Sequence, residues 1–260
     1  MIPTAPARAA PRAATWLPIY RLVLRSQVTR ARVLALLALD LAGLVVGVAL
    51  GATDRPLLEI VDGVLVPGQL LAGARFVNLF GLSLVVPVTA LVFAAASLGD
   101  PDEQGTLVYL WLRPVRRVRI VVAAAAASFT VAWPIVVVPL AITAAATRGG
   151  TELVIGTIAS STVALVAYVG IFCALGLVTK RSPVWGLLYI FIWEGFVATA
   201  ADAAAKLAIR TYARSVLQAI IDIPLRGTFI EAPANVVVPI AVGVAALAFA
   251  TWRLARRDIT

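Results

Sequence analysis

The chain has 260 residues, of which 62% are hydrophobic and 13% are charged, and its formal net charge is +9. A soluble protein of this length cannot bury so much apolar surface, so lipid is the expected solvent. Histidine is absent and cysteine occurs once, at Cys173. This composition excludes disulfides within the chain, zinc sites of the Cys/His type, haem ligation by His and Ser-His-Asp catalysis.

The positive charge is interpreted as a topological signal of a membrane protein, so no nucleic-acid partner is expected. Residues 1–15 are rich in Ala, Pro and Arg, which predicts a disordered tail, and residues 16–260 are expected to form one membrane domain. The segment 16–32 favours a helix on which Trp16 and Tyr20 suit the lipid headgroup zone. It is predicted to lie along the cytoplasmic leaflet, or else to be a basic flank of the first span. Its arginines on one side are Arg21, Arg25 and Arg32.

Six apolar stretches are each long enough to cross about 30 Å of hydrocarbon. They are 33–52, 76–98, 118–146, 153–178, 184–201 and 236–255. Pro87, Pro134 and Pro139 fall inside them and predict kinks. Asp40, in the first stretch, is expected at the interface or paired with a neighbouring helix. Small residues at Gly170, Gly176 and Ser160–Ser161 favour close helix contacts.

The distribution of Arg and Lys predicts that both termini are cytoplasmic. In that orientation fifteen basic residues lie inside and seven outside. The outside set is Arg55, Arg75, Arg148, Lys206, Arg210, Arg214 and Arg226.

The outer segment 202–235 lies between the fifth and sixth stretches. Lys206, Arg210 and Arg214 recur in it every four residues, which predicts an amphipathic helix ended by Pro224. This helix would lie on the outer membrane surface or enter the bilayer as a re-entrant element, and the sequence favours neither.

The segment 100–119 is a concentrated polar stretch bounded closely by apolar spans. Acids at Asp102 and Glu103 are followed by Gly105 and Thr106, an apolar run with Leu110 and Trp111, and then Arg113, Pro114, Arg116 and Arg117. One interpretation is a docking element for a partner, in which charges select the partner and apolar side chains anchor it. The alternative is a solvated loop whose arginines only set topology.

Glu194 lies within the fifth stretch, beside Trp193. A charge inside a membrane costs a few kcal/mol, so Glu194 is expected to face the bundle interior. It would then be a polar point on a substrate pathway or lock two helices together. A position near the outer interface is the other interpretation.

Together these features resemble the permease subunits of type-2 ABC exporters, which are six-span bacterial membrane proteins. The resemblance rests on the acids before Gly105-Thr106-Leu107, on Pro114, Val115 and Arg117, and on Trp193-Glu194-Gly195. The chain departs from the family pattern at Arg113, at Arg116 and at the alanines 123–125.

The resemblance implies an all-α protein of the bacterial plasma membrane that works with a second permease, either an identical copy or a homologue. It also implies a separate cytoplasmic ATPase that binds ATP and Mg and contacts the residues of the segment 100–119. The chain has no Gly-x-x-x-x-Gly-Lys-Ser/Thr phosphate loop, so it is not expected to bind a cofactor or to be an enzyme itself. The alternatives are a non-transporting scaffold or immunity protein and, less favoured, an intramembrane lipid-modifying enzyme.

Overall fold

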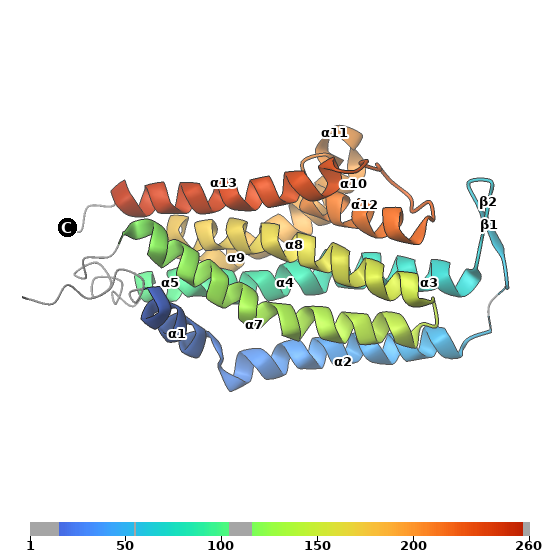
Figure 1. Cartoon of the computed structure of the whole chain (residues 1–260), viewed down its shortest axis with the longest axis horizontal. Coiled ribbons are helices and arrows are strands. Elements are labelled where there is room, and N and C mark those ends of the chain that lie inside the picture. Colours follow the sequence, from blue (N-terminus) through green and yellow to red (C-terminus); the bar gives the residue numbers. More distant parts are fainter. Residues whose placement is uncertain (1–15, 55, 104–115, 257–260) are drawn as a thin grey trace, which may run out of the picture.

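The protein is a long helical bundle, seen in a computed structural model that describes residues 16–54, 56–103 and 116–256. The structure is 82% helical (Figure 1). Its helices, including the π-helical segments η1 to η3, are α1 (Trp16–Gln27), α2 (Arg30–Ala52), α3 (Gly68–Phe76), η1 (Val77–Val85), α4 (Val86–Ala90), η2 (Leu91–Ala95), α5 (Ala96–Glu103), α7 (Arg117–Ala146), α8 (Thr151–Val178), α9 (Ser182–Leu188), η3 (Tyr189–Val197), α10 (Ala198–Ala200), α11 (Asp202–Ala205), α12 (Ile209–Ile221) and α13 (Ala234–Arg256).

The prediction of an all-α protein with six spans agrees with the structure, in which six helices are long and apolar enough to cross a membrane. They are Arg30–Ala52, Gly68–Gly99, Arg117–Ala146, Thr151–Val178, Ser182–Ala200 and Ala234–Arg256. The second begins at Gly68, earlier than the predicted residue 76. Gln69 and Arg75 lower the local hydropathy, but neither interrupts the helix after Pro67. The predicted tail 1–15 lies outside the described residues.

Helix α8 is the centre of the bundle and packs against α7, α12 and α13. Gly170 of α8 faces the backbone of Gly243 in α13, where a Cβ atom on Gly170 would meet the Gly243 Cα at 2.7 Å. Gly176 faces the backbone of Ala95 in the same way, at 2.5 Å from its carbonyl oxygen. The expectation of close helix contacts at these glycines is confirmed, because each lets two backbones approach more closely than a side chain would permit.

Helix α1 packs against α7 and lies at the end of the bundle that also holds α5 and the last turns of α13 (Figure 1). Ile19, Val23 and Gln27 recur every four residues and are buried, whereas Arg21 and Arg25 are exposed. The Gln27 side-chain amide donates a 2.8 Å hydrogen bond to Ser128 in α7. The Tyr20 hydroxyl donates a second hydrogen bond to α7, to Thr130 at 3.1 Å. The amphipathic helix expected from 16–32 therefore forms over its first twelve residues and is held to α7 by two polar contacts as well as by apolar packing.

Helix α12 lies alongside α8 within the bundle (Figure 1). Most of its residues, among them Val216 and Leu217, are buried. Helix α12 therefore packs into the bundle and does not stand apart from it, which favours the re-entrant alternative, while its depth in the membrane stays a prediction. The helix ends before Pro224, because Asp222 adopts a left-handed conformation (φ 52°) that terminates it.

The hairpin of β1 (Glu59–Val61) and β2 (Val64–Val66) was not predicted. Its turn residues Asp62 and Gly63 both have positive φ, at 49° and 83°. An Asp-Gly pair between apolar residues is a signal for such a turn. The hairpin matters here because Val61 lies at the edge of the cavity described below.

Asp40 is buried on α2, with 4% of its surface exposed. Neither of its carboxylate oxygens has a hydrogen-bond partner among the described residues. The expectation that it pairs with a neighbouring helix is therefore wrong for the part of the chain that the structure describes, and a position at the membrane interface stays a prediction.

Candidate functional site: an arginine-lined cavity

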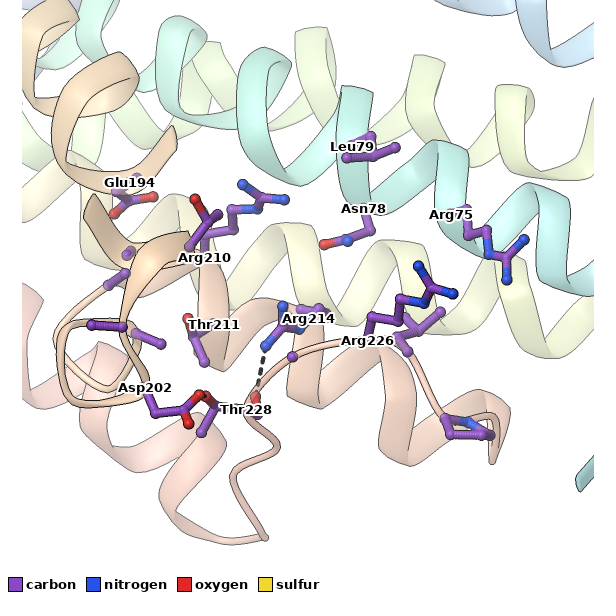
Figure 2. Close-up of a pocket in the computed structure, with 18 of the residues that line it drawn as sticks. Arg75, Asn78, Leu79, Glu194, Asp202, Arg210, Thr211, Arg214, Arg226 and Thr228 are labelled. Carbon is purple, nitrogen blue, oxygen red and sulfur yellow. Dashed lines mark hydrogen bonds between the residues drawn. The ribbon is translucent and has the colours of Figure 1, made fainter. Parts of the chain in front are cut away.

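A cavity of about 550 Å³ lies between the second and fifth spans and the segment that follows the fifth. Its walls come from α3 and η1, from η3 and α10, and from α11, α12 and the chain after α12. This volume falls within the range of small-molecule sites. Charged residues on its walls are Arg75, Glu194, Asp202, Arg210, Arg214 and Arg226 (Figure 2).

Glu194 closes one end of the cavity and is almost fully buried, with 3% of its surface exposed. Tyr168 of α8 donates its hydroxyl to one carboxylate oxygen, Oε2. Tyr189 donates to the other, Oε1, at 2.8 Å. The backbone N–H of Ile209 also donates to Oε1, at 3.2 Å. A carboxylate can accept all three, so this buried acid is satisfied by hydrogen bonds, with no metal or ion pair required.

The π-helical geometry of η3 explains why Tyr189 reaches Glu194. Residues five apart in an α-helix point about 140° away from each other, given 3.6 residues per turn. In a π-helix the backbone bonds run from residue i to i+5, which brings such residues onto one face. The local widening of the fifth span thus builds the Tyr189–Glu194 pair.

Glu194 also caps α12. The N-cap residue of this helix is Ala208, whose side chain has no acceptor for the free N–H groups of the first turn. The carboxylate of Glu194 supplies that acceptor from another helix and places a negative charge at the positive end of α12. The fifth span and α12 are joined through this contact, which favours the interpretation of Glu194 as a lock between helices.

The four arginines of the cavity are not paired with acids. Within the described residues, none of them forms an ion pair with a carboxylate, and the Nε atoms of Arg210 and Arg214 are buried without a hydrogen-bond partner. Arg214 donates to the carbonyl of Thr228 at 2.6 Å. Arg75 and Arg226 are exposed, whereas Arg210 and Arg214 are half-buried.

Burial lowers the pKa of Arg210 and Arg214, the two half-buried arginines of the cavity. At Arg210, the nearby Tyr168 and Glu194 oppose this shift in pKa. At Arg214, the positive charge of Arg210 adds to the shift in pKa that burial causes. Arg210 and Arg214 lie four residues apart on α12, a spacing at which like charges on a helix repel each other.

Asp202 lies on the cavity wall but is already engaged. Its Oδ1 accepts a 2.9 Å hydrogen bond from the Thr228 hydroxyl. Thr228 thus bonds to Asp202 through its hydroxyl and to Arg214 through its carbonyl, which holds the chain after α12 against the cavity (Figure 2). No group of three or more His, Cys, Asp or Glu residues that could hold a metal occurs in the described residues.

One of the predicted site residues lines the cavity, and the others lie elsewhere or outside the described residues. Glu194 lines the cavity, while Trp193 is half-buried and does not. Asp102 and Glu103 end helix α5, and Arg116 and Arg117 begin α7 as its N-cap and first residue. The remaining members of the coupling set lie outside the described residues: Gly105, Thr106, Leu110, Trp111, Arg113 and Pro114.

Comparison of the sequence with protein-family models and with curated proteins finds no match to either. The candidate site is therefore interpreted from its own geometry.

Sequence reasoning missed the cavity itself. It found the row of Lys206, Arg210 and Arg214, but assigned that row to topology and a surface helix. Arg75 and Arg226 carried no local signal, because each is an isolated basic residue, Arg75 just before the second apolar stretch and Arg226 within the outer segment 202–235.

Proposed function

We propose that this chain is the membrane-spanning permease subunit of an ATP-driven ABC exporter in the bacterial plasma membrane, with both termini cytoplasmic. It would form the substrate pathway with a second permease, identical or homologous. ATP and Mg would be bound by separate cytoplasmic ATPase subunits, and this chain would transmit their motion without catalysing hydrolysis.

The placement of the two helix ends that flank the motif is the observation that carries this proposal. Helices α5 and α7, which bound residues 104–115, meet at the end of the bundle that also holds α1 and the end of α13 (Figure 1). Trp252 near the end of α13 lies under the Arg256 guanidinium at 4.5 Å, a pairing suited to a membrane–water interface. The end of α5, the start of α7 with Arg116 and Arg117, and the end of α13 with Trp252 and Arg256 thus share one end of the bundle (Figure 1), which supports a cytoplasmic docking surface there.

The exposed apolar faces support a membrane location. Helices α2 and α13 and the fifth span expose more large apolar side chains than the surface of a soluble protein normally carries. Examples are Leu34, Leu41 and Val45 of α2, Phe191 and Phe196 of the fifth span, and Val244 of α13. Lipid or a second permease would cover them.

Affinity purification of the tagged chain from its native membrane, in mild detergent, tests the proposal. The expected companion is a stoichiometric protein that carries a phosphate-binding loop and hydrolyses ATP. A preparation without any ATPase would contradict the proposal and favour the scaffold, immunity-protein or lipid-modifying alternatives.

A charge reversal at the proposed docking surface makes the test sharper. Glu103→Lys is expected to lower recovery of the ATPase about tenfold, because like charges across an interface cost at least about 1.4 kcal/mol. Glu152→Lys is the matched control, since Glu152 is exposed in the first turn of α8, at the other end of the bundle. Equal loss in both variants would mean that the effect is not located at the segment 100–119.

A further inference from the structure

Most of the basic residues that the predicted topology places on the outer side of the membrane line one cavity. Of the seven assigned to the outer side, Arg75, Arg210, Arg214 and Arg226 line it. They come from three parts of the chain: α3, α12 and the segment after α12. Figure 2 shows their side chains following one another across the cavity, away from Glu194.

Without a bound anion, such a cluster of arginines carries a cost in free energy. Like charges at short range repel each other, and the repulsion grows as water is excluded. Arg210 and Arg214 are half-buried, and each has a buried Nε without a hydrogen-bond partner in the described part of the chain. They lie four residues apart on α12, so their like charges repel each other. A bound anion would remove both costs, because it supplies opposite charge and acceptor oxygens together.

The acids on the cavity wall do not remove these costs. Glu194 already accepts hydrogen bonds from two tyrosines and from the backbone N–H of Ile209, and Asp202 accepts one from Thr228. Four guanidinium charges and two carboxylate charges leave a formal excess of two positive charges. A phosphate monoester near neutral pH carries a charge of about −1.5 to −2 and three acceptor oxygens, which matches this excess.

We propose that the cavity lined by Arg75, Arg210, Arg214 and Arg226 is a binding site for a terminal phosphate group. The planar fork of a guanidinium matches two phosphate oxygens at once, which a point charge does not. Arg210 and Arg214 hold the inner side of the phosphate, and the exposed Arg75 and Arg226 close over it.

The walls also suit an apolar portion next to the phosphate. Leu79 lines the cavity and is 64% exposed on the surface of the second span, and Ala198, Ala205 and Leu225 are among the other apolar lining residues. The same phosphate chemistry could come from the headgroup of a lipid or from a free phosphate compound. The site does not depend on the proposed transport function, because it requires only this chain.

Calorimetric titration of the full chain, purified in mild detergent with any companions, tests the proposal. The probes are dioctanoyl phosphatidic acid, inorganic phosphate and dioctanoyl phosphatidylcholine. The test variant is Arg75→Gln with Arg226→Gln, since both side chains are exposed and neither makes a hydrogen bond within the described residues. The control is Arg148→Gln with Lys206→Gln, which removes the same charge from exposed positions outside the cavity.

The wild-type chain is expected to bind phosphatidic acid and to bind phosphatidylcholine at least about tenfold more weakly. The test variant should weaken phosphatidic acid binding at least about tenfold, and the control should change it by less than about twofold. Equal affinity for inorganic phosphate would assign the site to free phosphate compounds, and affinity for the amphiphile alone would assign it to a lipid headgroup.

Three outcomes would overturn the proposal. They are no binding of either phosphate probe, equal binding of phosphatidylcholine, and equal weakening by the test and control variants. The unliganded variants are compared with the wild type by thermal unfolding, so that a folding defect is recognised. Arg210→Gln is a second, single-site test at the inner end, with the same expected loss of affinity.

Discussion

The backbone N–H of Ile209 donates a 3.2 Å hydrogen bond to the Oε1 of Glu194, so a side chain of the fifth span caps the first turn of α12. The capped residue follows Ala208, which has no acceptor of its own. This one contact ties together two segments that both line the arginine cavity.

Glu194→Ala is expected to lower the free energy of unfolding by about 2–4 kcal/mol, because it removes a helix cap and leaves the buried hydroxyl of Tyr168 and the half-buried hydroxyl of Tyr189 without an acceptor. Glu194→Gln should cost about half as much, since its amide keeps one acceptor oxygen. Unfolding in mixed detergent micelles measures both. Glu231→Ala, at an exposed glutamate, is the control, and a Glu194→Ala variant as stable as this control would contradict the capping role.

Gly170→Ala is expected to destabilise the bundle by about 1–3 kcal/mol, because the added Cβ would collide with the backbone of Gly243. Thermal unfolding of the purified chain is the measurement. Gly195→Ala provides the comparison, since its Cβ would meet only the Ile190 carbonyl, at 3.4 Å. That change should leave stability unaltered or raise it by up to about 1 kcal/mol through helix propensity. Similar effects at both glycines would argue against a close crossing of α8 and α13.

Asp40→Asn is expected to raise the free energy of unfolding by about 1–3 kcal/mol, because it removes a buried carboxylate without a hydrogen-bond partner in the described residues. Chemical unfolding of wild type and variant side by side gives the difference. A loss of stability would instead show that Asp40 has a partner in another chain or outside the described residues.

Gln27→Ala is expected to loosen α1 from α7, because it removes the buried hydrogen bond to Ser128. Loss of about 1 kcal/mol corresponds to roughly fivefold faster amide exchange. Hydrogen–deuterium exchange over residues 16–27 reports this directly. Ser26→Ala is the neighbouring control, since the Ser26 hydroxyl bonds only within α1, to the Val23 carbonyl. Unchanged exchange in Gln27→Ala would mean that the apolar contacts of Ile19 and Val23 and the hydrogen bond from Tyr20 to Thr130 hold the helix without Gln27.

The features that the sequence by itself determined are those that depend on local patterns of residue type. Hydropathy and helix periodicity depend on neighbouring residues, so six apolar helices and an amphipathic α1 could be predicted from runs of residue types alone. The same local reasoning placed Glu194 toward the interior, because a charge on an apolar helix must find polar partners.

Only the tertiary structure decided which partners those are. Tyr168 and Ile209 reach Glu194 from two other elements, and the π-helical turn that aligns Tyr189 leaves no pattern in the residues around it. Arg75 shares a cavity with Arg210 and Arg226 only because α12 packs alongside α8. Packing depends on contacts between residues far apart along the chain, and periodicity carries no information about those distances.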